Sequence, residues 1–231
     1  MIDTIIDLYH GNSIDLPAAQ AGGIKAVIHK ATEGGSFMDH LYHQRRIAAK
    51  NLGLLWGAYH FSTGESVADQ VHYFLAYAKP EEDELIALDW EPSNGPDMTL
   101  AQAREFVQMI KNETGRWPVL YAGHLLRENL QHITDDILCN CPLWYARYAS
   151  APIGIPTHIW PNYTLWQYTD GNVGPEPHAT PGAHSGVDRN IFPGSAEELS
   201  QQWPFTRRSA ETPFGPGYSA ILSQTSPTVI A

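Results

Sequence analysis

The sequence predicts an α/β fold, a single irregular TIM-like β/α barrel. Eight short apolar runs of strand length follow one another within its 231 residues. Helical patterns separate the early runs, which is typical of parallel strands joined by covering helices. Residues 149–162 and 169–185, which separate later runs, are rich in proline and glycine and lack a helical pattern. We therefore expect helices mainly in the first five units and loops between the last strands.

The predicted strands are short apolar runs, most of them bounded by turn-forming residues. In order, they cover residues 5–9, 24–30, 54–61, 85–91, 117–122, 143–148, 163–168 and 186–192. The run that begins at residue 85 is apolar almost to its end, as expected of a strand that is buried on both faces. Eight such runs with helices between the early ones fit a closed barrel.

The predicted helices show apolar residues at intervals of three and four. They cover residues 40–51, 65–78 and 100–112, with one or two short helices over 125–137. In the second helix Val67, Val71 and Phe74 follow this spacing and should form its buried face. Gly53 is a stop signal for the first helix, and Thr99 is a plausible N-cap for the third.

The chain divides into a barrel and a short extension. With 43% hydrophobic residues, the chain has ample apolar surface for one sizeable core. We expect one barrel domain over residues 1–206. Residues 207–231 are rich in serine, threonine and proline with little periodicity, so we assign them to a C-terminal extension of unknown role.

Charge and hydropathy exclude several classes of partner. The net charge is −11 with only 14 lysines and arginines, which argues against nucleic acid as a partner. No window approaches a membrane span, so we expect no membrane insertion. The first residues show no basic region followed by an apolar stretch, so no signal peptide is visible. We expect a monomer.

The most informative stretch is the apolar run from Leu85 to Leu88, which leads into Asp89 and Glu91. Successive side chains of a strand point to opposite faces, so the two carboxylates share one face. An unpaired buried carboxylate is costly, so chance placement of two is improbable. The pattern indicates the catalytic end of a barrel strand, with Glu91 as a proton donor.

The other strand ends supply a matching set of polar and aromatic residues. Asp7 and Asp188 add two carboxylates, from the first and last strands. The candidate substrate-binding residues are Glu33, Tyr59, Tyr121, Tyr145, Trp166 and Gln167. Such a site suits sugars, because aromatic planes stack on apolar ring faces while carboxylates bind hydroxyls and move protons.

These residues give the chain a resemblance to family 25 of the glycoside hydrolases, the N,O-diacetylmuramidases or Chalaropsis-type lysozymes. The likeness covers roughly residues 3–195. It is carried by Asp7 before His10-Gly11-Asn12, residues 30–34 with Phe37 and Asp39, residues 57–61, residues 88–91, residues 165–168 and residues 187–190. Ser13 departs from the family pattern, in which proline, glycine or glutamate usually follows Asn12.

The resemblance implies hydrolysis of the β-1,4 bond between N-acetylmuramic acid and N-acetylglucosamine in bacterial peptidoglycan. By position, Glu91 is the general acid. Asp89 either orients the acetamido group of the substrate, whose oxygen then attacks, or raises the pKa of Glu91. Alternatively, Asp7 or Asp188 acts as base on a water molecule or stabilises the developing positive charge.

Two other functions compete with this hypothesis. One is a metal-dependent barrel amidase or deacetylase, in which His10, His60, Asp89 and Asp188 converge on one ion. No His-x-His or His-Glu-x-x-His pattern occurs, so we expect neither a catalytic metal nor another cofactor. The other is a glycan-binding module without catalysis.

The biological setting is less constrained by the sequence. Without a visible signal peptide, we expect action on the bacterial wall, in the periplasm or outside the cell, after one of two routes of release. One is holin-dependent release of a phage-type enzyme. The other is a dedicated secretion system, in which case an immunity protein is a further expected partner.

Overall fold

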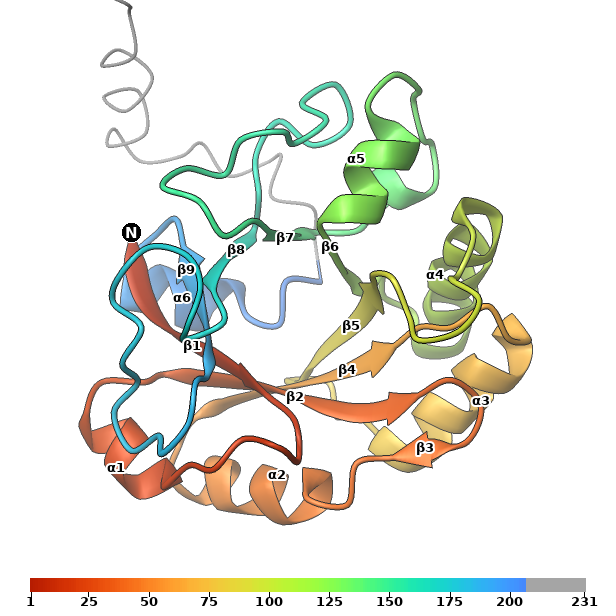
Figure 1. Ribbon diagram of the computed structural model, residues 1–231. Helices are drawn as coiled ribbons and strands as arrows, with labels where there is room; N and C mark the ends of the chain where they lie inside the picture. Colours follow the sequence, from red (N-terminus) through yellow and green to blue (C-terminus); the bar gives the residue numbers. More distant parts are fainter. Residues whose placement is uncertain (207–231) are drawn as a thin grey trace, which may run out of the picture.

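The computed structural model of this protein describes residues 1–206, and the predicted extension over 207–231 lies outside this range. Its centre is a closed barrel of eight strands, with helices packed around one side (Figure 1). The predicted barrel is confirmed. Among residues 1–206, no helix is long and apolar enough to span a membrane.

The barrel closes through pairing of its first two strands. Hydrogen-bonded neighbours run in the order β1, β2, β4, β5, β6, β7, β8, β9 and back to β1, while the short β3 pairs with β2 outside this ring. The bounds are β1 (Ile2–Leu8), β2 (Ala26–Glu33), β3 (Phe37–Met38), β4 (Leu55–Phe61), β5 (Leu85–Trp90), β6 (Val119–Ala122), β7 (Leu143–Ala146), β8 (Leu165–Thr169) and β9 (Asp188–Phe192).

The last strand departs from the regular pattern. Within the barrel ring, which excludes β3, all neighbouring pairs from β1 through β8 are parallel, but β9 runs antiparallel to both β8 and β1. The connection from β8 to β9 contains no helix that would return the chain to the other end of the barrel. The first residue of β9, Asp188, therefore lies opposite Asp7 near the carboxyl end of β1.

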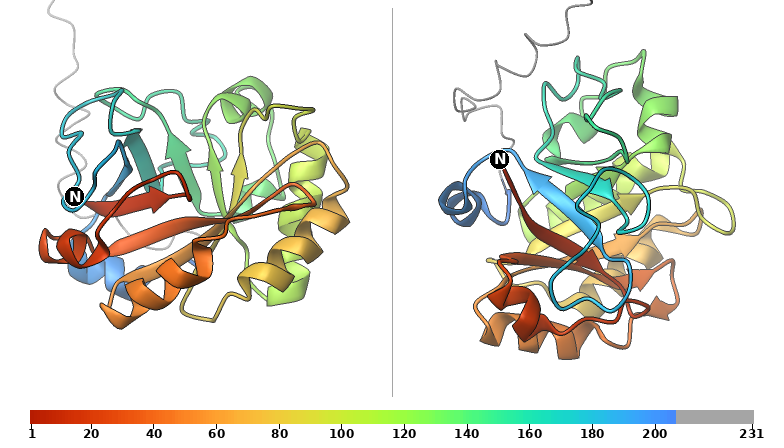
Figure 2. Two further views of the ribbon diagram at one scale, coloured as in Figure 1. Left: turned by 60° about the horizontal axis from the view of Figure 1, so that its bottom comes forward. Right: turned by 60° about the vertical axis from the view of Figure 1, so that its left-hand side comes forward.

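Helices cover the barrel mainly beside β2 to β6, while loops cover β7 and β8 (Figures 1 and 2). The predicted helices are present, and α1, α6 and β3 are elements that the periodicity did not indicate. Thr99 caps α4 in a capping box with Gln102. The bounds are α1 (Leu16–Ala21), α2 (Tyr42–Asn51), α3 (Val67–Ala78), α4 (Leu100–Thr114), α5 (His124–Leu130), a 3₁₀ turn η1 (Leu138–Asn140) and α6 (Ala196–Gln202).

The core has two layers, and β5 contributes to both. Leu85 and Ala87 point into the barrel, whereas Ile86, Leu88 and Trp90 pack between the barrel and the surrounding segments. The segment after α6 covers the end of the barrel where the strands begin. Its Trp203 and Phe205 belong to the inner layer of the core. Continuing the alternation along β5 puts Asp89, and then Glu91, on the inner face at the open end.

Candidate active site

A pocket of about 230 Å³ opens at the carboxyl ends of the parallel strands. All four predicted carboxylates line it, and they come from β1, β9 and the end of β5. The lining residues are Asp7, Tyr9, Lys30, Tyr59, Phe61, Asp89, Glu91, Tyr121, Trp144, Gln167 and Asp188. The pocket is therefore acidic and aromatic, as the strand ends indicated.

Strand β5 fixes the central pair of acids. Asp89 lies in register with Phe61 on β4 and Tyr121 on β6, and all three side chains line the pocket. Between the two acids, Trp90 turns outward, and its indole Nε1 donates to the carbonyl of Met98 at 2.8 Å. This outward anchor holds the end of the strand in place, so the two carboxylates stay on the inner face.

Burial changes the proton affinity of both acids. It raises the pKa of Glu91 to about 7, and the negative charge of Asp7 adds to this while Lys30 opposes it. Burial also raises the pKa of Asp89, with the charge of Glu91 as the next cause. Glu91 is therefore partly protonated near neutral pH, which suits a general acid.

Asp89 differs from its neighbours in its hydrogen bonding. Asp89 is 6% exposed, and its Oδ1 is buried without a hydrogen-bond partner among residues 1–206. A buried carboxylate oxygen without a donor is destabilising, so the carboxyl of Asp89, unlike that of Asp7, has unused capacity to accept a hydrogen bond.

Asp7, by contrast, is held by two side-chain amides. Gln167 Nε2 lies 3.2 Å from Asp7 Oδ1 and 3.0 Å from Asp7 Oδ2, and Asn190 Nδ2 donates to Oδ2 at 2.8 Å. The orientation of Asn190 follows from Trp144, whose indole N–H can only donate and reaches Asn190 Oδ1 at 2.6 Å. Burial nevertheless raises the pKa of Asp7, and these hydrogen bonds oppose the rise.

Asp188 also has a raised pKa. Burial raises its pKa to about 10, and the neighbouring charge of Asp7 is the next cause. Asp188 Oδ2 also accepts from Gln167 Nε2 at 3.2 Å. The nearby Arg189 does not pair with this acid; it pairs with Asp3, with its Nη2 2.7 Å from Oδ2.

The structure places the predicted aromatic residues in two groups. Tyr59 and Tyr121 line the pocket as expected, but Tyr145 and Trp166 do not. Tyr145 and Trp166 belong to the outer layer of the core, where the Tyr145 hydroxyl donates to the carbonyl of Ile153 and the Trp166 indole to that of Arg147. Each of these two residues lies one position out of phase with the inner face of its strand, so its predicted contact with substrate stays a prediction.

Glu33 also lies beside the pocket instead of lining it. Its carboxylate pairs with the ammonium of Lys30, which does line the pocket. The same ammonium lies 4.5 Å from the ring centre of Phe61. Lys30 is thus the cation of the site, and Glu33 contacts it from outside.

The residues of the competing metal hypothesis do not converge. His60 points outward, where its ring stacks on Phe106 and its Nε2 lies 3.1 Å from Gln70 Oε1. His10 Nδ1 lies 3.1 Å from Asp39 Oδ2. Within residues 1–206, groups of three ligands close enough for one ion do not include any acid of the pocket.

Several site residues were not assigned from the sequence. Trp144, Phe61, Tyr9 and Lys30 line the pocket, and Asn190 supports it from behind. Phe61 and Lys30 belong to strand ends that were predicted, so their positions offered a signal. Trp144 offered none, because its neighbours on β7 are equally apolar.

The comparisons with known proteins agree with this geometry. Residues 6–176 match the family model described as Glycosyl hydrolases family 25. An N,O-diacetylmuramidase from Arthroderma benhamiae is 29% identical over 202 residues, or 82% of this chain and 81% of the relative. An N,O-diacetylmuramidase from Chalaropsis sp is 31% identical over 177 residues, or 68% of this chain and 83% of the relative.

The fold is similar to that of a solved relative. The structure of a muramidase from Acremonium alcalophilum matches with a TM-score of 0.72 and 30% sequence identity, covering 87% of this chain and 97% of that one. The family match spans most of the barrel, including β5 and the acids at its end. A barrel with four carboxylates in one pocket, together with this match, places the chain in family 25 of the glycosyl hydrolases.

Proposed function

We propose that this glycoside hydrolase is an N-acetylmuramidase that cleaves the β-1,4 bond between N-acetylmuramic acid and N-acetylglucosamine in bacterial peptidoglycan, with Glu91 as the general acid. The observation that carries this proposal is the position of Glu91, which lies with three other acids in one pocket of a chain that matches the family model. Burial raises the pKa of Glu91 to about 7. A carboxyl that keeps its proton near neutral pH can protonate the oxygen of the leaving sugar. The catalytic unit is proposed to be residues 1–206.

Asp89 is proposed to act directly on the substrate. Its carboxyl lines the pocket and its Oδ1 has no hydrogen-bond partner within the described chain, so this group has unused capacity to accept from the N–H of the acetamido group of N-acetylmuramic acid. A hydrogen bond there would orient the acetamido oxygen for attack on the anomeric carbon. The alternative is attack by water with a carboxylate as base.

Asp7 and Asp188 are proposed to act through charge. Both oxygens of Asp7 already accept hydrogen bonds from Gln167, and one also accepts from Asn190, which makes Asp7 a poorer base than an unpartnered carboxylate. A fixed negative charge in a buried pocket stabilises the positive charge that develops on the sugar ring. Tyr59, Tyr121 and Trp144 supply aromatic surface for the sugar rings.

The proposal is tested with purified peptidoglycan and the Glu91→Gln variant. We expect hydrolysis to fall by about 10²–10⁴-fold, because the amide cannot donate the acid proton. Products of the parent enzyme, reduced with borohydride before sugar analysis, should carry N-acetylmuramic acid at the reducing end. Glu128→Gln, an exposed substitution on α5, is the matched control. Full activity of Glu91→Gln, or N-acetylglucosamine at the reducing end, contradicts the proposal.

The proposed place of action is the bacterial wall, in the periplasm or outside the cell, because peptidoglycan is found there. Holin-dependent release and a dedicated secretion system with an immunity protein both stay predictions, as does the monomeric state. Neighbouring genes for a holin, or for secretion and immunity proteins, would separate the two routes.

A further inference from the structure

Gln167 on β8 occupies the centre of a hydrogen-bond network behind the four acids. Its Nε2 lies within 3.0–3.2 Å of three oxygens, two on Asp7 and one on Asp188. Its Oε1 lies 2.8 Å from the hydroxyl of Tyr121 and 3.1 Å from that of Tyr148. The amide therefore joins two tyrosines on one side to two carboxyls on the other.

The two tyrosines fix the orientation of this amide. With Oε1 toward Tyr121 and Tyr148, both hydroxyls donate to it and both amide hydrogens face the acids. In the reverse orientation the amide oxygen would face two carboxyls, and both hydroxyls would lose their acceptor. Buried polar groups without partners are destabilising. Only the first orientation gives partners to the amide, both hydroxyls and both carboxyls.

Asp7 and Asp188 also lie close to each other. They are directly opposite in the β1–β9 pairing, and an oxygen of each lies within 3.2 Å of the same nitrogen, Gln167 Nε2. Two carboxylates held at one such point repel each other, which favours the state in which one of them keeps its proton. The arrangement therefore favours one protonated and one ionised acid, and the amide of Gln167 binds on the same side of both.

We infer that Gln167 is a positioning residue which, held by the hydroxyls of Tyr121 and Tyr148, keeps Asp7 and Asp188 as a pair that shares one proton and carries one negative charge beside Glu91. This inference rests on the proposed function, since it assigns the source of the charge that acts on the acid and on the sugar. It changes the predicted role of Gln167 from a ligand of the substrate to a support for the acids.

Other charged or titratable groups also face the pair. They are Tyr9 after β1, Lys30 on β2, Tyr59 on β4, Asp89 and Glu91 at the end of β5, Tyr121 on β6, Tyr148 after β7 and Asp170 after β8. Lys30 is the one cation among these lining residues, and it already pairs with Glu33. Gln167 is the residue that donates to both members of the pair.

The test is the pH dependence of kcat/KM in Gln167→Met, which keeps the length of the side chain and removes its donors. Gln167 lowers the pKa of Asp7 by donating to its anion. Without these donors the pair takes up its second proton at higher pH. The acid limb of the pH profile, which is the range where kcat/KM falls at low pH, should therefore move up by about one pH unit. We expect kcat to fall about tenfold while KM stays within about threefold.

Tyr148→Phe gives a second route to the same answer. Tyr148 is 39% exposed, so losing its hydroxyl should not prevent folding. Removing one of the two hydroxyls that donate to Gln167 should move the acid limb to higher pH by a smaller amount. Tyr168→Phe is the matched control, because Tyr168 follows Gln167 on β8 but its hydroxyl donates to Asp3 Oδ2 at 2.7 Å. The acid limb of Tyr168→Phe should stay at the pH of the parent enzyme.

The outcomes separate this inference from the proposed function. If Glu91→Gln is inactive but the acid limb stays in place in Gln167→Met and Tyr148→Phe, the inference is wrong and the proposed function stands. If Gln167→Met does not fold, the limb of Tyr148→Phe decides. If Glu91→Gln is fully active, the proposed function is wrong and the inference falls with it.

Discussion

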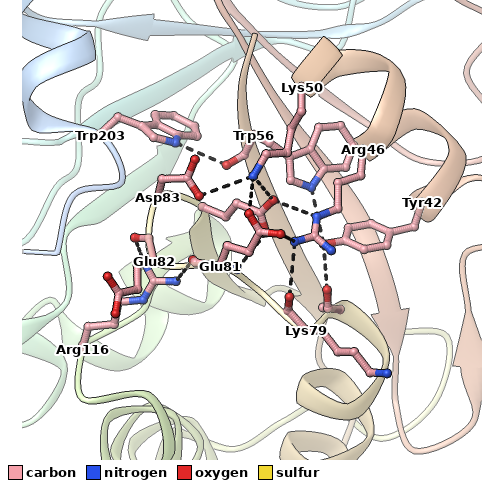
Figure 3. Close-up of polar contacts among 12 residues, drawn as sticks. Tyr42, Arg46, Lys50, Trp56, Lys79, Glu81, Glu82, Asp83, Arg116 and Trp203 are labelled. Atoms are coloured by element: carbon pink, nitrogen blue, oxygen red, sulfur yellow. Dashed lines mark hydrogen bonds and ion pairs between the residues drawn. The ribbon is translucent and has the colours of Figure 1, made fainter. Parts of the chain in front are cut away.

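The two ends of the barrel each hold a cluster of acids, but only one end neutralises them. At the end where the strands begin, Glu84 is 1% exposed and lies 2.7 Å from Arg46 and 3.0 Å from Lys50. The same two cations reach the exposed Glu81 and, from Lys50, Asp83 (Figure 3). This cluster is hereafter the paired end.

At the opposite end, the pocket holds four carboxylates and the single cation Lys30, which is already paired with Glu33. Burial raises the pKa of each of these carboxyls, so they bind protons. The acids of the paired end instead form ion pairs with lysine and arginine side chains. The difference teaches that the number of buried acids does not decide their role. Cations near an acid make it a structural ion pair, and their absence leaves it able to exchange protons.

The largest change in stability is expected at the paired end. Glu84→Gln would leave Arg46 and Lys50, 15% and 31% exposed, without their buried partner. We expect the free energy of unfolding to fall by about 2–4 kcal/mol, since removing one partner of a buried ion pair leaves the other charge uncompensated. Urea titration measures this, and kcat/KM of the folded variant should match that of the parent.

The neighbouring Glu82→Gln is the matched control for this change. Glu82 is exposed, and its backbone carbonyl, not its carboxylate, accepts from Arg116 at 2.8 Å. Its variant should keep the stability of the parent. Equal losses in Glu82→Gln and Glu84→Gln would show that the general charge of this loop matters and the buried pairing does not.

A smaller effect is expected in the pH dependence of stability, which also distinguishes the two ends of the barrel. The pKa of Glu91 is about 7 in the folded chain and 4.5 in the reference state, so the folded form binds this proton more tightly. The contribution of Glu91 to stability should therefore fall as pH rises from about 4.5 to about 7, by about 2 kcal/mol after allowance for partial exposure. Unfolding of the parent and of Glu91→Gln, measured from pH 4.5 to 8, checks this.

Glu91→Gln should remove the part of that slope that comes from Glu91, because its amide does not titrate, while Asp7, Asp89 and Asp188, whose pKa values burial also raises, keep their parts. Glu84→Gln should keep the whole slope, because the acid pocket is intact in that variant. An equal slope in the parent and in Glu91→Gln would assign it entirely to the other three acids.

The fold was largely predictable from periodicity. The apolar runs and helical stripes are local signals, and each predicted strand and helix is present with shifted ends. The reversed direction of β9 was not predictable, because the loop over residues 170–187 has no pattern that indicates at which end of the barrel the chain re-enters. Its consequence is functional, since reversal brings Asp188 to Asp7.

The site was predictable where polarity changes along a strand, and not elsewhere. The acids after Leu88 interrupt an apolar run, so they indicate their own position. On β7, Trp144 and Tyr145 are both aromatic and both buried, so alternation does not tell which one faces inward. The register between Tyr121 and Trp144 decides it, and register depends on contacts between strands far apart in the sequence.

The smallest effect is expected from Glu81→Gln at the paired end. Glu81 contacts the same cations as Glu84, with Lys50 Nζ 2.7 Å from its Oε2, but it is 61% exposed. The hydrogen bond from Lys50 lowers the pKa of Glu81, so the stabilising effect of this ion pair is present above pH 4.5 and is lost as the pH falls below it.

Water and salt screen exposed pairs, so in Glu81→Gln the free energy of unfolding at pH 7 should change little, and the change should depend on ionic strength. Thermal unfolding at low and high salt checks this. A loss as large as that of Glu84→Gln would mean that the exposed network, and not the buried carboxylate, holds the paired end together.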